Sequence, residues 1–228
     1  MTLEQMTALD EMLPFEPFEH SKCSFTVCSK EKPEVVLGLE LAADHNEAVA
    51  VSKERAAAFQ EAVAKMPAGC QITLFLAKYI DEIFERYMDT HRLQADGATP
   101  HRWLYSYMGA VASSVVRRAD GESALLIDLI ERETLRRSRE NGYTAIYTAN
   151  TNRVTVVCSY DSHLTRSYAN LYPFSLRICT VCMVQASGHR LGYETIQVIH
   201  PQELEVEGTK PFVALPSDFV VELVVKYL

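Results

Sequence analysis

The sequence predicts an α/β fold in which helices flank a mixed central sheet, and two observations lead to this prediction. An apolar stretch at 103–116, a helical pattern from about 122 and a second apolar stretch at 143–149 give the order strand, helix, strand. A connection through a helix of this length joins parallel strands by a right-handed crossover. Strand-like stretches at 193–199 and 218–228 then close the chain.

The first hundred residues alternate between helical and extended patterns. The expected elements are a helix at 2–12, strands at 23–29 and 33–43 joined by a polar turn, and helices at 52–66 and 72–88. Ser52 is the expected N-cap of the first long helix, and Pro67 its stop. The length suits one domain. We therefore expect a single domain over 1–228 with a helical insertion at about 52–102.

The helix after the central strand has clear ends. Its expected apolar face comprises Leu125, Leu126, Leu129 and Ile130. Glu122 lies at the positive end of the helix dipole, and arginines crowd the negative end. Gly142 is placed to end the helix in the left-handed conformation.

Composition and charge exclude some classes of function. The chain has 228 residues, 48% hydrophobic and 23% charged, with a formal net charge of −8. This balance argues against general binding of nucleic acid or anionic membranes and would suit a cationic small substrate. No stretch is long and apolar enough to span a bilayer, and the N-terminus lacks the apolar core of a signal peptide. The expected setting is the reducing cytoplasm.

Six cysteines allow two interpretations. Cys179 and Cys182 form a single Cys-x-x-Cys pair, which is a poor zinc signal because a closed tetrahedral site needs four ligands. His163 and His189 could complete such a site. Buried thiols acting as small hydrophobic groups are the favoured alternative, and we expect no metal.

The turn before the predicted helix has the chemistry of an anion site. A helix N-terminus presents unpaired backbone N–H groups and partial positive charge. Gly121 lets the backbone approach a ligand closely, while Ser123 and Ala124 are small. Arg117 and Arg118 add charge for a phosphate. A solvated turn with two surface arginines is the alternative.

These residues carry a resemblance. The block 111–146 resembles the acyl-CoA-binding core of the Gcn5-related N-acetyltransferase (GNAT) superfamily, with Arg118, Gly121 and Ser123 at the positions of its Arg/Gln-x-x-Gly-x-Gly/Ala motif. Ser123 stands where Gly or Ala is usual. Weaker similarities to arylalkylamine-type members are Arg-Leu-Gly-Tyr at 190–193, Gly-Thr-Lys-Pro-Phe at 208–212 and Phe-Glu-Pro-Phe at 15–18.

The resemblance implies a GNAT fold and transfer of an acetyl or other short acyl group from acetyl-CoA (acyl-CoA) to a small-molecule amine by direct attack. In the family a backbone N–H at the position of Ala110 or Val111 polarises the thioester carbonyl. The implied cofactor-binding residues are Ala110, Val111, Arg117, Arg118, Gly121, Glu122, Ser123, Ala124 and Asn152.

Two catalytic residues are implied in the same way. Glu16 matches the family's glutamate, and the apolar neighbours Phe15, Pro17 and Phe18 could desolvate it into a general base; an exposed turn is the alternative. Tyr160 is the candidate general acid for the leaving thiolate, although with eleven tyrosines core packing is an alternative for each.

The binding site for the amine that accepts the acyl group is expected along the helical insertion at about 52–102. Glu82, Glu85 and Asp89 could attract a cation or form a solvated face, and Trp103 could cap the pocket or the core. The rival interpretation is a catalytically inactive GNAT-fold module that binds coenzyme A or serves as a regulatory subunit. A different nucleotide-binding α/β domain is disfavoured because neither G-x-G-x-x-G nor G-x-x-x-x-G-K-[ST] occurs. The oligomeric state stays open, with a homodimer among the allowed states.

Overall fold

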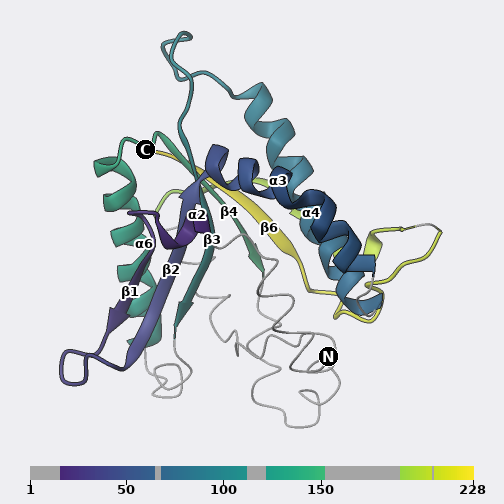
Figure 1. Ribbon diagram of the computed structural model, residues 1–228, viewed down its shortest axis with the longest axis horizontal. Coiled ribbons are helices and arrows are strands. Elements are labelled where there is room, and N and C mark those ends of the chain that lie inside the picture. Colours follow the sequence, from purple (N-terminus) through teal and green to yellow (C-terminus); the bar gives the residue numbers. More distant parts are fainter. Residues whose placement is uncertain (1–15, 65–67, 112–121, 152–190, 207) are drawn as a thin grey trace.

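The computed structural model describes residues 16–64, 68–111, 122–151, 191–206 and 208–228, and within these ranges one sheet has helices on both faces (Figure 1). The strand order is β1-β2-β3-β4-β6-β5. The elements are α2 (Glu16–Glu19), β1 (Phe25–Cys28), β2 (Val36–Asp44), α3 (His45–Ala64), α4 (Ala68–Thr90), β3 (Trp103–Val111), α6 (Glu122–Glu140), β4 (Ala145–Thr151), β5 (Glu194–Ile199), a 3-10 turn (Pro201–Glu203) and β6 (Val221–Tyr227).

The pairing of the strands confirms the predicted mixed sheet. β1 and β2 form the expected antiparallel hairpin, and β2 pairs antiparallel with β3. β3 and β4 are parallel, as the crossover through α6 requires. The two closing strands were also predicted, and β6 lies between β4 and β5 with both pairings antiparallel.

Alternating side chains of the strands build one core on each face of the sheet. On one face, Phe84 and Met88 of α4 pack with Trp103, Tyr147 and Leu223. The buried position of Trp103, which is 6% exposed, places it in this core. On the other face the core comprises Cys23, Ala42, Leu104, Leu135, Tyr143, Ile146, Tyr193 and Val224.

The buried face of α6 differs from the predicted one. Ile130 is buried as expected, but Leu129 is 62% exposed, so its assignment to the apolar face was wrong. Ile127 is buried in its place, and Thr134 follows seven residues later on the same side. Thr134 is tolerated there because its hydroxyl donates a 2.9 Å hydrogen bond to the Ile130 carbonyl.

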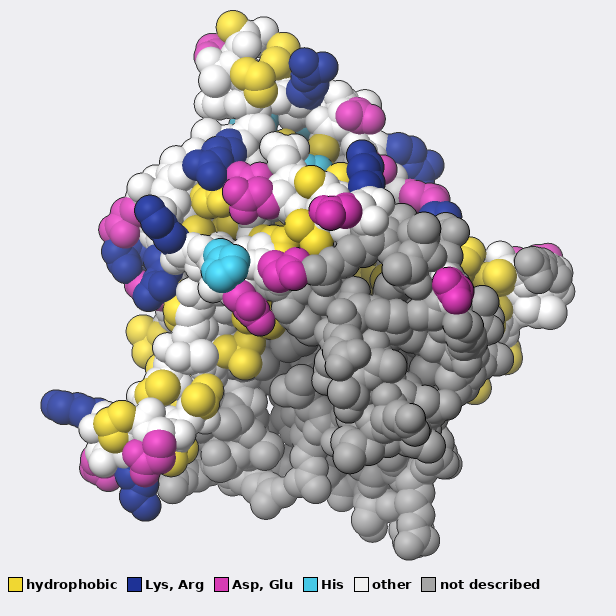
Figure 2. Space-filling model, in the orientation of Figure 1, with side chains coloured by type: hydrophobic (Ala, Val, Ile, Leu, Met, Phe, Trp, Pro, Cys, Tyr) yellow, Lys and Arg dark blue, Asp and Glu magenta, His cyan; other side chains and the backbone are white. Residues whose placement is uncertain are grey.

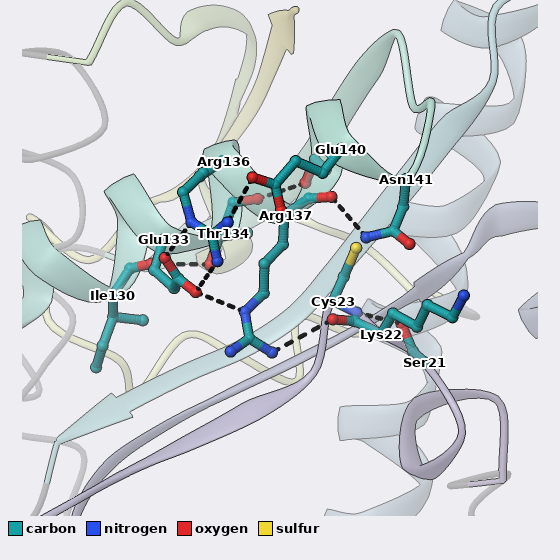
Figure 3. Close-up of polar contacts among 11 residues, drawn as sticks. Ser21, Lys22, Cys23, Ile130, Glu133, Thr134, Arg136, Arg137, Glu140 and Asn141 are labelled. Carbon is teal, nitrogen blue, oxygen red and sulfur yellow. Dashed lines mark hydrogen bonds and ion pairs between the residues drawn. The ribbon is translucent and has the colours of Figure 1, made fainter.

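The second half of α6 is tied to the segment before β1 (Figure 3). Glu133 accepts hydrogen bonds from Arg136 and Arg137 of the next turn. Arg137 also donates a 3.3 Å hydrogen bond to the Lys22 carbonyl. The helix is therefore anchored at its C-terminal end, close to where β4 begins.

The first long helix begins seven residues earlier than predicted. It starts at His45, directly after β2, so the prediction that Ser52 is its N-cap was wrong. Asp44 takes that role, because its carboxylate accepts a 3.0 Å hydrogen bond from the Asn46 backbone N–H. The second long helix, α4, contains the whole predicted stretch 72–88.

The surface of the described part mixes charges of both signs. Acidic and basic side chains are interspersed on the coloured part of the face in Figure 2. No helix in the described ranges is long and apolar enough to cross a membrane. The helix predicted at 2–12 lies outside the described residues.

Candidate functional site

The most distinctive feature of the sheet is the separation of its two central parallel strands. β3 and β4 pair over three residue pairs, from Trp103 with Ala145 to Tyr105 with Tyr147. Both strands continue, β3 to Val111 and β4 to Thr151, and Figure 1 shows the two arrows diverging. We call the stretches of β3 and β4 that do not pair with each other, 106–111 and 148–151, the splay. Backbone groups that face into the splay can pair with an extended ligand as an added strand would.

A bulge in β3 lies at the start of the splay. Leu41 of β2 pairs with Met108, but Ala42 pairs with Ser106, so Tyr107 is an extra residue in β3. Bulges bend a strand and re-aim its side chains, and they are common beside active sites. The bulge therefore accompanies the turn of β3 away from β4.

The first turn of α6 lies toward the same end of the sheet. α6 ends at Glu140, a few residues before the start of β4, so its N-terminal end points toward the diverging ends of the strands (Figure 1). Glu122, Ser123 and Ala124 form this first turn. The unpaired N–H groups of such a turn can hold a phosphate near the open end of the splay.

Aromatic side chains cover the start of the splay on the face that carries α4. The stacked rings of Tyr105 and Tyr147, with centroids 4.8 Å apart, mark the last pair of the ladder. Tyr107, 39% exposed, lies next to Tyr105, and the buried Phe18 of α2 approaches Tyr107 at 5.2 Å. These four residues, the ring wall, offer an apolar surface beside the splay.

Polar groups also lie on the face of the sheet that carries α4. His45 Nδ1 and the Tyr147 hydroxyl are 2.8 Å apart. Burial lowers the pKa of His45, which favours the neutral imidazole, although nearby Glu85 and Asp44 oppose the effect. Asp81 of α4 is solvent-exposed, yet the surrounding protein raises the pKa of its carboxyl to about 6, and Glu85 and Glu82 add to the rise.

A second polar group lies on the opposite face, under α6. Glu40 of β2 is 2% exposed and accepts a 2.6 Å hydrogen bond from the Ser106 hydroxyl. Burial raises its pKa well above the usual value, with a further contribution from Glu131 of α6. Asn150, 5% exposed, lies near the end of β4 and pairs in register with Glu222.

The structure places part of the predicted site. Ala110 and Val111 end β3, in register with Leu39 and Gly38. Glu16 begins α2 and is solvent-exposed, so the partial burial expected for it does not occur. Other predicted site residues lie outside the described residues, namely Arg117, Arg118, Gly121, Asn152 and Tyr160.

Sequence reasoning missed the ring wall and the buried Glu40. Strand alternation could have indicated that Tyr105 and Tyr107 share a face with Trp103. Asp81 also has a signal, because it lies three residues before Phe84 and seven before Met88 on one side of α4. The predicted acidic residue Asp89 is exposed at the far end of that helix.

Two other features of the described residues lie apart from the splay. An open hollow between α6 and β6 is lined by Arg132, Leu135, Arg139, Leu191 and Lys226. Lys226 pairs in register with Ile146, which places this hollow at the paired end of β4. Cys23 and Cys28 are free thiols, and no group of potential metal ligands occurs among the described residues.

Comparisons with known proteins give matches among solved structures. The chain superimposes on the C-terminal condensation domain of Ebony in complex with beta-alanyl-dopamine with a TM-score of 0.59, at 16% identity, over 100% of this chain and 82% of that one. Arylalkylamine N-acetyltransferase 2 from Aedes aegypti gives a TM-score of 0.58 at 13% identity, over 97% of this chain and 79% of that one. A putative arylalkylamine N-acetyltransferase 7 from the yellow fever mosquito gives a TM-score of 0.55 at 12% identity, over 97% of this chain and 70% of that one. No protein-family model and no curated protein sequence matches the chain.

These likenesses show the fold. The mixed sheet, the flanking helices and the nearly complete coverage identify the GNAT fold that the resemblance of 111–146 predicted. At this level of identity, the reaction and the substrates are a separate question.

Proposed function

We propose that the chain is an N-acyltransferase that transfers an acetyl or other short acyl group from acyl-CoA to the amine of a small molecule. The observation that carries this proposal is the splay between β3 and β4, beside which the first turn of α6 begins. The extended arm and the phosphates of coenzyme A fit the splay and the first turn of α6. The strand edges supply N–H donors for the amides of the arm, and the helix N-terminus supplies them for the phosphates. The solved structures with this fold include N-acetyltransferases.

In this proposal the backbone along Ser106–Val111 binds and orients the donor, and an N–H group at Ala110 or Val111 polarises the reacting carbonyl. Acetyl-CoA supplies the thioester. The phosphates are held by the first turn of α6, Glu122–Ala124, and by the residues just before it, Arg117, Arg118 and Gly121. Asn152, the residue after β4 in the sequence, is a further donor-binding residue.

The acceptor lies on the face that carries α2 and α4. Glu16 takes the proton of the attacking amine as general base, and Tyr160 protonates the leaving sulfur. The ring wall excludes water from the space beside the reacting groups. Direct attack needs no covalent enzyme intermediate.

Thermal unfolding with and without acetyl-CoA tests the donor site. Ligand at about 100 times its dissociation constant should stabilise the folded chain by roughly 2.7 kcal/mol. Gly121→Glu should abolish this shift, because a carboxylate repels the phosphates and its side chain fills the turn. Ala95→Glu, which adds the same charge in an exposed loop, should keep it. An equal shift in wild type and Gly121→Glu would remove the α6 turn from the proposal.

The alternative is a module of the same fold that binds coenzyme A without turnover. Release of free thiol from acetyl-CoA in the presence of amines distinguishes the two. A thermal shift without thiol release from any amine would favour the inactive module, whereas the absence of a shift at millimolar acetyl-CoA would argue against both.

A further inference from the structure

Helix α4 runs antiparallel to the two central strands, and this fixes which of its side chains lies over the splay. Near its C-terminal end, Tyr87 lies 6.4 Å from Trp103, at the start of β3. One turn earlier, Phe84 lies 4.6 Å from Tyr147, in the last pair before the splay. A further step of three residues back along the helix, about 4.5 Å, reaches Asp81.

Asp81 borders the buried face of α4. It shares one side of the helix with Phe84 and Met88, which are 1% and 7% exposed. Its own side chain is accessible to solvent. In the described ranges, neither a hydrogen bond nor an ion pair holds its carboxylate.

The surroundings of Asp81 differ from those of an ordinary surface carboxylate. Burial raises the pKa values of Tyr105, Tyr107 and Tyr147, and the charge of Asp81 adds to all three shifts, which agrees with its place one step beyond Phe84 along α4. Its own pKa, about 6, leaves it mostly ionised at pH 7.5. An ionised, solvent-accessible carboxylate beside aromatic rings is a suitable receptor for an ammonium group attached to an apolar body.

We propose that Asp81 binds the ammonium group of the acceptor, so that the chain prefers amines with an uncharged remainder over zwitterionic amino acids. This inference rests on the proposed function, since it names a specificity residue for that reaction. A carboxylate on the acceptor would lie near Asp81 and Glu85 of the same helix, and like charges at this distance disfavour binding.

The test uses the full chain, acetyl-CoA and two matched pairs, phenethylamine with phenylalanine and 3-methylbutylamine with leucine. Each pair differs by one carboxylate. Thiol release is measured for wild type, Asp81→Asn and Asp81→Glu. Glu82→Gln is the matched control, because it removes the charge of the next residue, which points away from the side that Asp81 shares with Phe84 and Met88. Melting temperatures and the acetyl-CoA shift verify that each variant folds and keeps the donor site.

Wild type should use the amine of a pair at least about tenfold better than its amino acid. Asp81→Asn should raise the KM for the amine about tenfold or more with a smaller change in kcat, as expected for loss of a charged hydrogen bond. Asp81→Glu should keep the preference for amines, and Glu82→Gln should stay within about twofold of wild type.

Two results would overturn the inference while leaving the proposed function intact. One is an unchanged KM in Asp81→Asn, and the other is an equal loss in Glu82→Gln. If wild type binds acetyl-CoA but releases no thiol with any of the four acceptors, the acyltransferase function and this role of Asp81 fail together. A lack of acetyl-CoA binding in wild type would instead contradict the donor site.

Discussion

The Ser106 hydroxyl donates a 2.6 Å hydrogen bond to Oε1 of Glu40, which joins β2 to β3 at the start of the splay. The other oxygen, Oε2, lies 3.1 Å from the position that a Cβ atom on Gly109 would occupy. A carboxyl group thus fills the space next to the bulge, where a larger residue at 109 would crowd it. Burial raises the pKa of Glu40 well above the usual value, which favours the protonated carboxyl.

The protonation of Glu40 leads to a comparison between two substitutions. Glu40→Gln should change the free energy of unfolding by less than about 1 kcal/mol, because an amide has the same shape and still accepts from Ser106. Ser106→Ala should destabilise by about 1–3 kcal/mol, since the buried carboxyl loses its donor. Denaturant unfolding at pH 7 measures both. A larger loss in Glu40→Gln than in Ser106→Ala would mean that Glu40 is ionised in the folded chain.

Glu131 predicts a dependence of stability on pH. Its pKa rises from 4.5 to about 7 because of burial, opposed by a hydrogen bond from Tyr193 and increased by Asp128. The charge of Glu131 in turn raises the pKa of the buried Glu40. The folded state therefore holds the proton more tightly than the unfolded state, and the stability from this group falls as pH rises from about 4.5 to 7. Glu131→Gln should abolish this fall and stabilise the chain at pH 8 by on the order of 1–3 kcal/mol.

Glu133, on the same helix, is a control for which the dependence of stability on pH has the opposite sign. Hydrogen bonds from Arg136 and Arg137 lower the pKa of Glu133 to about 2. Its contribution to stability is present above about 4.5 and is lost as pH falls toward 2, so Glu133→Gln should lower stability at neutral pH. If the difference in unfolding free energy between wild type and Glu131→Gln did not vary between pH 4.5 and 8, desolvation of Glu131 by the surrounding protein would not control its titration.

The order of the described elements was accessible from the sequence because it depends on local patterns. Apolar stretches and turn signals marked the strands, and the parallel pairing of β3 with β4 followed from the helix between them. The ends of helices were harder to predict from the sequence. Asp44, which caps α3, is also the last residue of β2, and no loop separates the two elements to signal the change.

The candidate site depends on contacts that no local pattern encodes. The exposure of Leu129 reflects how α6 rotates to place Ile127 and Thr134 on the sheet. Phe18, Tyr107 and Asp81 come from three elements far apart in the sequence, and register and packing bring them to the splay. The resemblance to a family supplied the residues of the proposed donor site, whereas those of the proposed acceptor site could be brought together only in the fold.

At the end of α6, Gly142 has a φ of +76°. The Tyr143 N–H donates to the Ser138 carbonyl and the Gly142 N–H to the Arg139 carbonyl, both at 3.0 Å, which together form a Schellman motif. Gly142→Ala should destabilise by about 1 kcal/mol, Gly142→Asn by less and Gly142→Val by more, because a side chain strains the left-handed conformation and β-branching increases the strain. The nearest atom to an added Cβ is Arg102 Nη1 at 3.8 Å, which is an ordinary contact. The losses of stability should therefore depend on how well each residue adopts the left-handed conformation and not on the size of its side chain. Denaturant midpoints rank the three variants, and equal losses in Asn and Val would contradict the conformational explanation.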